Sequence, residues 1–118
     1  QRDALNAAER WLVPVDAQRY ADAWAMGAAS LKSTVGRHEI RDGMRDLRKE
    51  YGRVVLRKAE KLAYLGAPPS PEEGGTKEGA KVSILFDTKF VRNRQATEEL
   101  LMELERDGLW RVAGYFIR

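Results

Sequence analysis

The residues best suited to acid–base chemistry are few in this sequence. His38 is the only histidine, and Asp42 follows it by one helical turn. A histidine oriented by a carboxylate can act as a general base. However, the spacing places no serine, cysteine or second acid beside this pair, so a nucleophile is missing. We therefore predict no catalytic residue and interpret His38 as an exposed histidine without a chemical role.

Metal and phosphate-loop chemistry are also poorly supported. A metal site needs about three converging ligands, whereas the chain offers one histidine, no cysteine and scattered carboxylates. Gly74, Gly75 and Gly79 are not followed by the helix start and lysine–serine pair of a phosphate-binding loop. The sequence therefore predicts neither a metal site nor a cofactor.

Arginines recur along a predicted helix over residues 37–50. Their spacings of four, four and three residues put them on one stripe, and such a stripe can bind phosphates or carboxylates. Acidic residues interleave with them, which is typical of a solvated helix face with weak ion pairs. We favour the solvated face over the anion site. The arginines are Arg37, Arg41, Arg45 and Arg48, and the acids are Glu39, Asp42, Asp46 and Glu50.

Arg48 and Arg57 flank Gly52, where the predicted helix gives way to a strand. Arginine side chains at such a corner can donate to the last helical carbonyls and tie the helix to the sheet. The alternative is an anion-binding site. The sequence leaves both roles, structural and anion-binding, open for these two residues.

Two acids interrupt apolar strand runs, Glu60 and Asp87. Glu60 shares the parity of Leu62 and could point inward, in which case a cation must pair with it. Arg57 or Arg111 could provide that cation. An inward carboxylate in a pocket is what an isomerase or dehydratase would need, but we read the pair as structural first.

Aromatic residues are spread over the chain at positions expected to face inward. They could line an apolar pocket between helices and sheet, or they could form a solid core, which we favour because aromatics at core spacing usually serve packing. The ligand-pocket candidates are Trp11, Tyr20, Trp24, Phe86, Phe90 and Trp110.

Three helices are expected in the first part of the chain. The first runs from Asp3 to about Val13, because Pro14 disfavours helix at the residue before it. Asp16 caps a second helix that continues to about Leu31, with a break over residues 30–36. The third covers residues 37–50, with an apolar face on the side opposite its arginines.

Four strands are expected after the helices, over residues 53–65, 81–91, 96–106 and 109–117. The second alternates most clearly, with apolar Val82, Ile84 and Phe86 at every other position. Residues 66–75 contain three prolines and three glycines and predict a loop. Residues 96–106 have the composition of a helix, but we predict a strand because the following turn requires one.

That turn is Asp107-Gly108, typical of a two-residue type I′ hairpin. In the last strand Trp110, Val112, Gly114 and Phe116 would then face the helices. An apolar face turned away from the helices would be a surface for a homodimer. The residues expected on it are Leu85, Leu109, Ala113, Tyr115 and Ile117.

Length, composition and charge narrow the kinds of protein that this chain can be. The 118 residues suit a single domain, and 43% hydrophobic with 33% charged residues is typical of a globular protein. No apolar run of about 18 residues exists, so no membrane span is predicted. A net charge of +3 gives little support to nucleic acid as a partner. Binding of nucleic acid through the basic third helix and residues 92–94 is therefore kept only as a third hypothesis.

Motifs along nearly the whole chain resemble one bacterial family, domain of unknown function 4019, of the cystatin-like or nuclear transport factor 2-like superfamily. The resemblance implies an α+β cone with three N-terminal helices on a curved four-stranded antiparallel sheet. It implies no known activity. The matching pieces are Trp11-Leu12, Asp16, Tyr20, Trp24, Arg48, Gly52, Arg57, residues 86–90, Glu99 and residues 107–115.

The resemblance also implies export, to the periplasm or the exterior, because members of the family usually look like exported proteins. The chain begins with Gln1 rather than methionine, as a cleaved signal peptide or a deliberately shortened chain would explain. Our first hypothesis is a non-enzymatic domain that binds a protein partner or a small apolar ligand. The alternative is an isomerase- or dehydratase-type enzyme with a carboxylate in its pocket.

Overall fold

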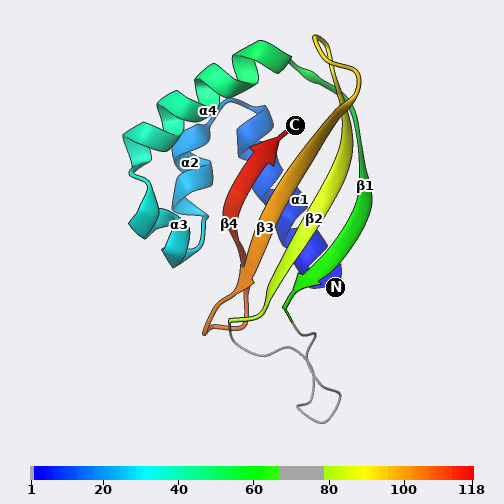
Figure 1. Ribbon diagram of the computed structural model, residues 1–118. Helices are drawn as coiled ribbons and strands as arrows, with labels where there is room; N and C mark the ends of the chain where they lie inside the picture. Colours follow the sequence, from blue (N-terminus) through cyan, green and yellow to red (C-terminus); the bar gives the residue numbers. More distant parts are fainter. Residues whose placement is uncertain (1, 67–78) are drawn as a thin grey trace.

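The computed structural model describes residues 2–66 and 79–118, and the predicted loop over 66–75 lies almost wholly outside them. The helices are α1 (Arg2–Asp16), α2 (Tyr20–Ala25), α3 (Ala29–Thr34) and α4 (Arg37–Tyr51). The strands are β1 (Val54–Leu65), β2 (Lys81–Phe90), β3 (Ala96–Leu104) and β4 (Trp110–Ile117). The strands form one antiparallel sheet in the order β1-β2-β3-β4. The predicted α+β fold is confirmed, with the helices on one side of a curved sheet (Figure 1).

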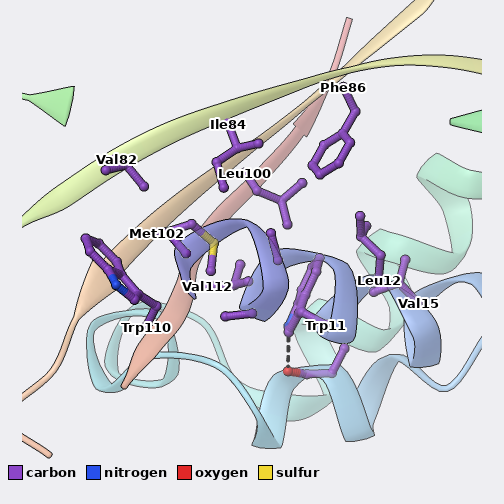
Figure 2. Close-up of a cluster of buried hydrophobic side chains, with 14 of the residues drawn as sticks. Trp11, Leu12, Val15, Val82, Ile84, Phe86, Leu100, Met102, Trp110 and Val112 are labelled. Carbon is purple, nitrogen blue, oxygen red and sulfur yellow. Dashed lines mark hydrogen bonds between the residues drawn. The ribbon is translucent and has the colours of Figure 1, made fainter. Parts of the chain in front are cut away.

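The core lies between α1 and the inner face of the sheet. Trp11, Leu12 and Val15 of α1 are at most 2% exposed and face apolar side chains from β2, β3 and β4 (Figure 2). Small residues on the same helix face, Ala4 and Ala8, let the helix lie close to the strands. The Trp11 Nε1–H donates to the carbonyl of Ala23 at 2.8 Å, so α2 is fixed to α1 from within the core.

The predicted end of the first helix at Val13 is wrong, because α1 contains Pro14 and continues to Asp16. Pro14 and Val15 are buried, so the apolar contacts of this last turn outweigh the hydrogen bond that proline cannot make. Asp16 therefore ends α1 and does not cap a second helix. The stretch expected to form that helix holds α2 and α3, separated where Ala28 N–H donates to Val112 O of β4 at 2.8 Å.

Residues 96–104 are a strand, as the hairpin argument predicted, but the turn after it differs from the expected type. Gly108 N–H donates to Glu105 O at 2.9 Å, Glu105 N–H donates to Leu109 O at 3.0 Å, and Gly108 has a positive φ of 84° whereas Asp107 does not. This is a type I turn followed by a left-handed glycine. Asp107 instead accepts from Leu109 N–H at 3.1 Å, which holds the turn without a strained backbone.

Extra residues in two strands reverse the faces that simple alternation predicts. In β4 Leu101 pairs with Gly114 and Met102 with Val112, so Ala113 is a bulge. Tyr115 consequently turns inward against Trp11, and Phe116 is 45% exposed on the outer face. The expected inward position of Phe116 is therefore wrong.

Irregularities in β1 have the same effect. The register shifts between Val54 and Leu56 and again between Ala59 and Lys61. Leu56 is 56% exposed, and Glu60, whose parity with Leu62 could have turned it inward, is exposed as well. The residues on the outer face of the sheet are therefore not all those that simple alternation predicts. The homodimer through that face stays a prediction.

Candidate functional site

An apolar pocket lies beside β4, between that edge strand and helices α3 and α4. Its volume is about 250 Å³. Among its lining side chains, Trp11 and Tyr115 alone carry a nitrogen or oxygen atom. The lining residues are Trp11, Leu31, Val35, Ile40, Met44, Val112, Ala113, Gly114, Tyr115 and Phe116, all within the described part of the chain.

Both of these polar atoms are already engaged. The rings of Trp11 and Tyr115 pack with centroids 5.4 Å apart at an interplanar angle of 53°. The Trp11 N–H donates to Ala23 O, and the Tyr115 hydroxyl donates to Oε2 of Glu98. The pocket therefore offers ring surface and aliphatic carbon to a ligand, together with backbone of the bulged strand.

The six residues predicted to line one pocket lie in different places in the structure. Trp11 lines the apolar pocket, whereas Tyr20 lines a second, basic cleft. Phe86 and Phe90 are at most 1% exposed in the interior, and Trp110 is 7% exposed. The remaining tryptophan, Trp24, is partly buried and donates its Nε1–H to Val35 O at 2.8 Å.

A buried ionic cluster lies behind Tyr115, centred on Glu98, whose side chain is fully buried. Its Oε1 accepts from Arg57 Nε at 2.7 Å and from Thr88 Oγ1 at 2.6 Å. Its Oε2 accepts from Arg57 Nη2 at 3.1 Å and from the Tyr115 hydroxyl. Four donors fill the acceptor positions of a carboxylate, so Glu98 is held by its neighbours on every side.

Arg57 connects this cluster to the end of α1. Its Nη1 and Nη2 donate to Asp16 at 2.7 and 3.0 Å, while its other bonds reach Glu98. Burial lowers the pKa of Arg57, but the hydrogen bonds to Asp16 and Glu98 outweigh it and raise the pKa above its ordinary value. Burial, followed by the charge of Glu98, also raises the pKa of Tyr115. Both groups therefore keep their protons at neutral pH.

Arg48 of α4 meets the same carboxylate of Asp16, with Nη2 donating to Oδ1 at 3.1 Å. Its guanidinium lies over the Phe90 ring at 5.1 Å, and the side chain is 7% exposed. The helical carbonyl expected to receive an arginine here is instead bound by Arg92, whose Nη1 donates to Lys49 O at 2.5 Å.

Neither acid that interrupts an apolar strand run is the buried one. Glu60 and Asp87 are exposed, and Arg111 pairs with Glu105 and Asp107 in the last hairpin. The buried carboxylate is Glu98, which sequence reasoning missed. A signal was present, because Glu98 shares the parity of the inward residues of its strand, Ala96, Leu100, Met102 and Leu104.

The remaining polar candidates of α4 are at the surface. Asp42 accepts from Arg41 at 3.0 Å and lies 3.4 Å from Arg45, and the hydrogen bond from Arg41 lowers its pKa. His38 is exposed. Within residues 2–66 and 79–118, no three histidine, cysteine or acidic side chains lie close enough to hold a metal ion. None of the helices in these ranges is long and apolar enough to cross a membrane.

A family profile described as protein of unknown function (DUF4019) matches residues 7–115. The chain belongs to this family. The match runs from α1 to the inward Tyr115 and so includes the ionic cluster, Arg48 and every lining residue of the pocket except Phe116. Among curated proteins, no sequence matches the chain.

Solved structures share the fold of this DUF4019 member at low identity. Aln2 from a Streptomyces species is 12% identical with a TM-score of 0.58, covering 99% of this chain and 88% of its own. A Catenulispora acidiphila protein in complex with S-DNPA is 10% identical with a TM-score of 0.58, covering 98% and 90%. A Novosphingobium aromaticivorans protein, provisionally described as an aromatic ring hydroxylase, is 14% identical with a TM-score of 0.53, covering 98% and 87%.

Proposed function

We propose that this protein binds a small, flat apolar molecule in the pocket beside β4 and does not transform it. The observation that carries the proposal is the lining itself, which is aliphatic and aromatic and includes the tilted pair Trp11 and Tyr115. Apolar pockets with few polar groups are the usual binding sites for small molecules.

The volume limits the size of the ligand. Pockets for drug-sized ligands span roughly 300–1,000 Å³, and this one has about 250 Å³. A compound of one or two fused rings therefore fits better than a larger one. The Ala113 bulge and Gly114 also bring the strand itself into the lining beside the apolar side chains.

The proposal that the ligand is not transformed rests on the groups that face it. Among the described residues, the lining contains no acid, histidine, lysine or arginine, so it provides no general acid or base. The buried carboxylate nearest in the network, Glu98, already accepts four hydrogen bonds and is sealed behind Tyr115.

The enzymatic alternative rests on one observation, that Tyr115 both lines the pocket and donates to Glu98. A tyrosine held by a carboxylate could donate a hydrogen bond to an enolate oxygen, as isomerases require. For that, the hydroxyl would have to leave Glu98 and turn into the pocket. Conversion of a bound cyclic ketone by the wild type, lost in Tyr115→Phe, would favour this alternative over simple binding.

Two of the structural neighbours are consistent with a ligand in this fold. One is described in complex with S-DNPA, and another is provisionally described as an aromatic ring hydroxylase. At 10% and 14% identity these descriptions apply to those proteins, and they support only the choice of aromatic probes here.

The test is titration of the protein with indole and with naphthalene, followed by methyl NMR. We expect saturable shifts in the methyl groups of Leu31, Ile40 and Met44, which line the pocket. Val35→Phe should fill part of the cavity and weaken binding by about tenfold or more. Val55→Phe is the matched control, because Val55 is 48% exposed on the distant strand β1. Shifts scattered over the surface, or equal weakening by both variants, would refute the proposal.

A further inference from the structure

A second cleft opens where the ends of α1 and α4 meet the start of β1. Its volume is about 490 Å³, and it is bounded by Val15 and Tyr20 on its apolar side. The remaining lining is strongly basic. Its charged residues are Asp16, Arg45, Arg48, Lys49, Arg53 and Arg92.

The cations in this cleft exceed what its carboxylates can neutralise. Among the described residues, Asp16 is the only acid in the lining, and two of its hydrogen bonds come from Arg57 outside the cleft. Arg45 is balanced by Asp42 and Asp46 on its own helix. In the described part of the chain, Lys49 and Arg53 make no ion pair, and a positive excess therefore remains at the rim.

Arg48 supplies the observation that points to a ligand. Its side chain is only 7% exposed, and its Nε and Nη1 find no hydrogen-bond partner among the described residues. A buried N–H group without a partner is costly, and such groups are rare in folded proteins. Arg48 lines the cleft, but both of these N–H groups are covered by surrounding atoms, so an anion can accept from them only once the guanidinium turns toward the opening.

Two structural features account for part of this arrangement. Arg48 lies over the Phe90 ring, which offsets some of its charge. Arg92 donates to Lys49 O, so it serves the negative end of the α4 dipole. Neither feature supplies an acceptor for the two free N–H groups of Arg48, and neither involves Arg53.

We propose that this cleft binds a phosphate dianion, either inorganic phosphate or the terminal phosphate of a small phosphomonoester. The Arg48 guanidinium would present its free Nε–H and Nη1–H to the oxygens, as arginine does in other phosphate sites. Lys49 and Arg53, both exposed, would close over the remaining oxygens. A dianion matches the excess of positive charge better than a single carboxylate does. This site lies apart from the apolar pocket, and the proposal is independent of the function proposed above.

The experiment uses three probes of graded charge: inorganic phosphate, phenyl phosphate and the monoanionic diester dimethyl phosphate. Binding is followed by the rise in melting temperature and by the Arg48 Nε–H resonance in an NMR titration. We expect saturable binding of the first two, with a shifted Arg48 resonance, and binding of the diester weaker by about tenfold. Tighter binding of phenyl phosphate than of phosphate would identify a monoester as the better ligand, and the reverse would identify the free ion.

Arg53→Gln and Arg41→Gln form a matched pair of variants. Both remove one exposed positive charge, but Arg41 lies on α4 outside the cleft and pairs with Asp42. We expect Arg53→Gln to weaken phosphate binding by about tenfold and Arg41→Gln to leave it within about twofold. An equal loss of phosphate affinity in both variants would show that only the overall charge matters, and it would refute the proposed site. An unmoved Arg48 resonance, or a diester that binds as tightly as the monoester, would overturn it as well.

Discussion

Arg57 and Arg48 reach the same carboxylate from different elements, β1 and α4, yet their surroundings are opposite. Arg57 makes four hydrogen bonds, shared between Asp16 and Glu98. Arg48 makes one, to Asp16, and its Nε and Nη1 are unpaired among the described residues. Both are largely buried, at 15% and 7% exposure. The contrast indicates that burial alone does not make an arginine structural; its buried donors must also be paired.

The difference follows from what faces each guanidinium. Arg57 lies opposite Thr88 in the sheet register, and both side chains contact Glu98 of β3, which completes the set of acceptors for Arg57. Arg48 faces the Phe90 ring on one side and borders the basic cleft, where the described residues offer it no acid besides Asp16. Arg57 therefore has all of its acceptors within one ionic network, whereas Arg48 borders the basic cleft.

The largest effect is expected from Arg57→Met. It leaves Glu98 as a buried carboxylate without its cation, and breaking a buried pair costs about 3–5 kcal/mol. Chemical unfolding followed by circular dichroism measures the loss. Total stabilities are only about 5–15 kcal/mol, so the variant should be close to unfolding at about 37 °C.

A double-variant cycle separates the pair from simple packing loss. Arg57→Met combined with Glu98→Gln should be less destabilised than the sum of the single variants, because no unpaired charge is left in the core. If the losses of unfolding free energy were additive, Arg57 would act through packing. Its ion pair with Glu98 would then not distinguish it from Arg48.

The second prediction concerns Tyr115→Phe, which removes one donor from Glu98 and keeps the ring against Trp11. Hydrogen bonds to a charged group contribute about 1.5–3 kcal/mol, and we expect a loss in that range. Because burial raises the pKa of Tyr115, its contribution is present below the ordinary tyrosine value and is lost as pH rises through its folded value. Alkaline titration of wild type should therefore show one tyrosine that ionises only on unfolding.

The third prediction tests the other side of the comparison. Arg48→Met should change the free energy of unfolding by no more than about 1 kcal/mol in either direction, because it removes a buried cation with one partner and leaves Asp16 bound to Arg57. The same variant should abolish stabilisation by phosphate. A loss as large as that of Arg57→Met would place both arginines in one structural network.

Much of the architecture could be predicted from the sequence. The alternation of β2 and the strand over residues 96–104 were read correctly, as was the helix beginning at Arg37. These signals are regular and local, with period two or with apolar residues one helical turn apart. The helices and strands that they fix already place an apolar core between α1 and the sheet.

The site was harder to predict because it depends on single inserted residues. A bulge such as Ala113 adds one residue to a strand and leaves no mark in composition, yet it moves Tyr115 to the inner face. Glu98 could have been found from parity alone, and Arg57 is one of two cations that the sequence suggests for an inward carboxylate, but their pairing across 41 residues could not be predicted. The distinction between Arg48 and Arg57 required the positions of their acceptors.

The smallest effect is expected at the last hairpin, where Arg111 binds two carboxylates as Arg57 does. It contacts Glu105 and Asp107 at 2.8 Å each, but the Asp107 side chain is half exposed to water. Exposed pairs are screened by solvent and salt, so Arg111→Gln should shift the unfolding midpoint slightly at low salt and not measurably at high salt. The hydrogen bond from Arg111 lowers the pKa of Asp107, so this contribution is present above the ordinary aspartate pKa and disappears as pH falls through the folded value. A salt-independent loss approaching that of Arg57→Met would show that the number of bonded carboxylates, rather than their burial, sets the effect, because Arg111 matches Arg57 in that number alone.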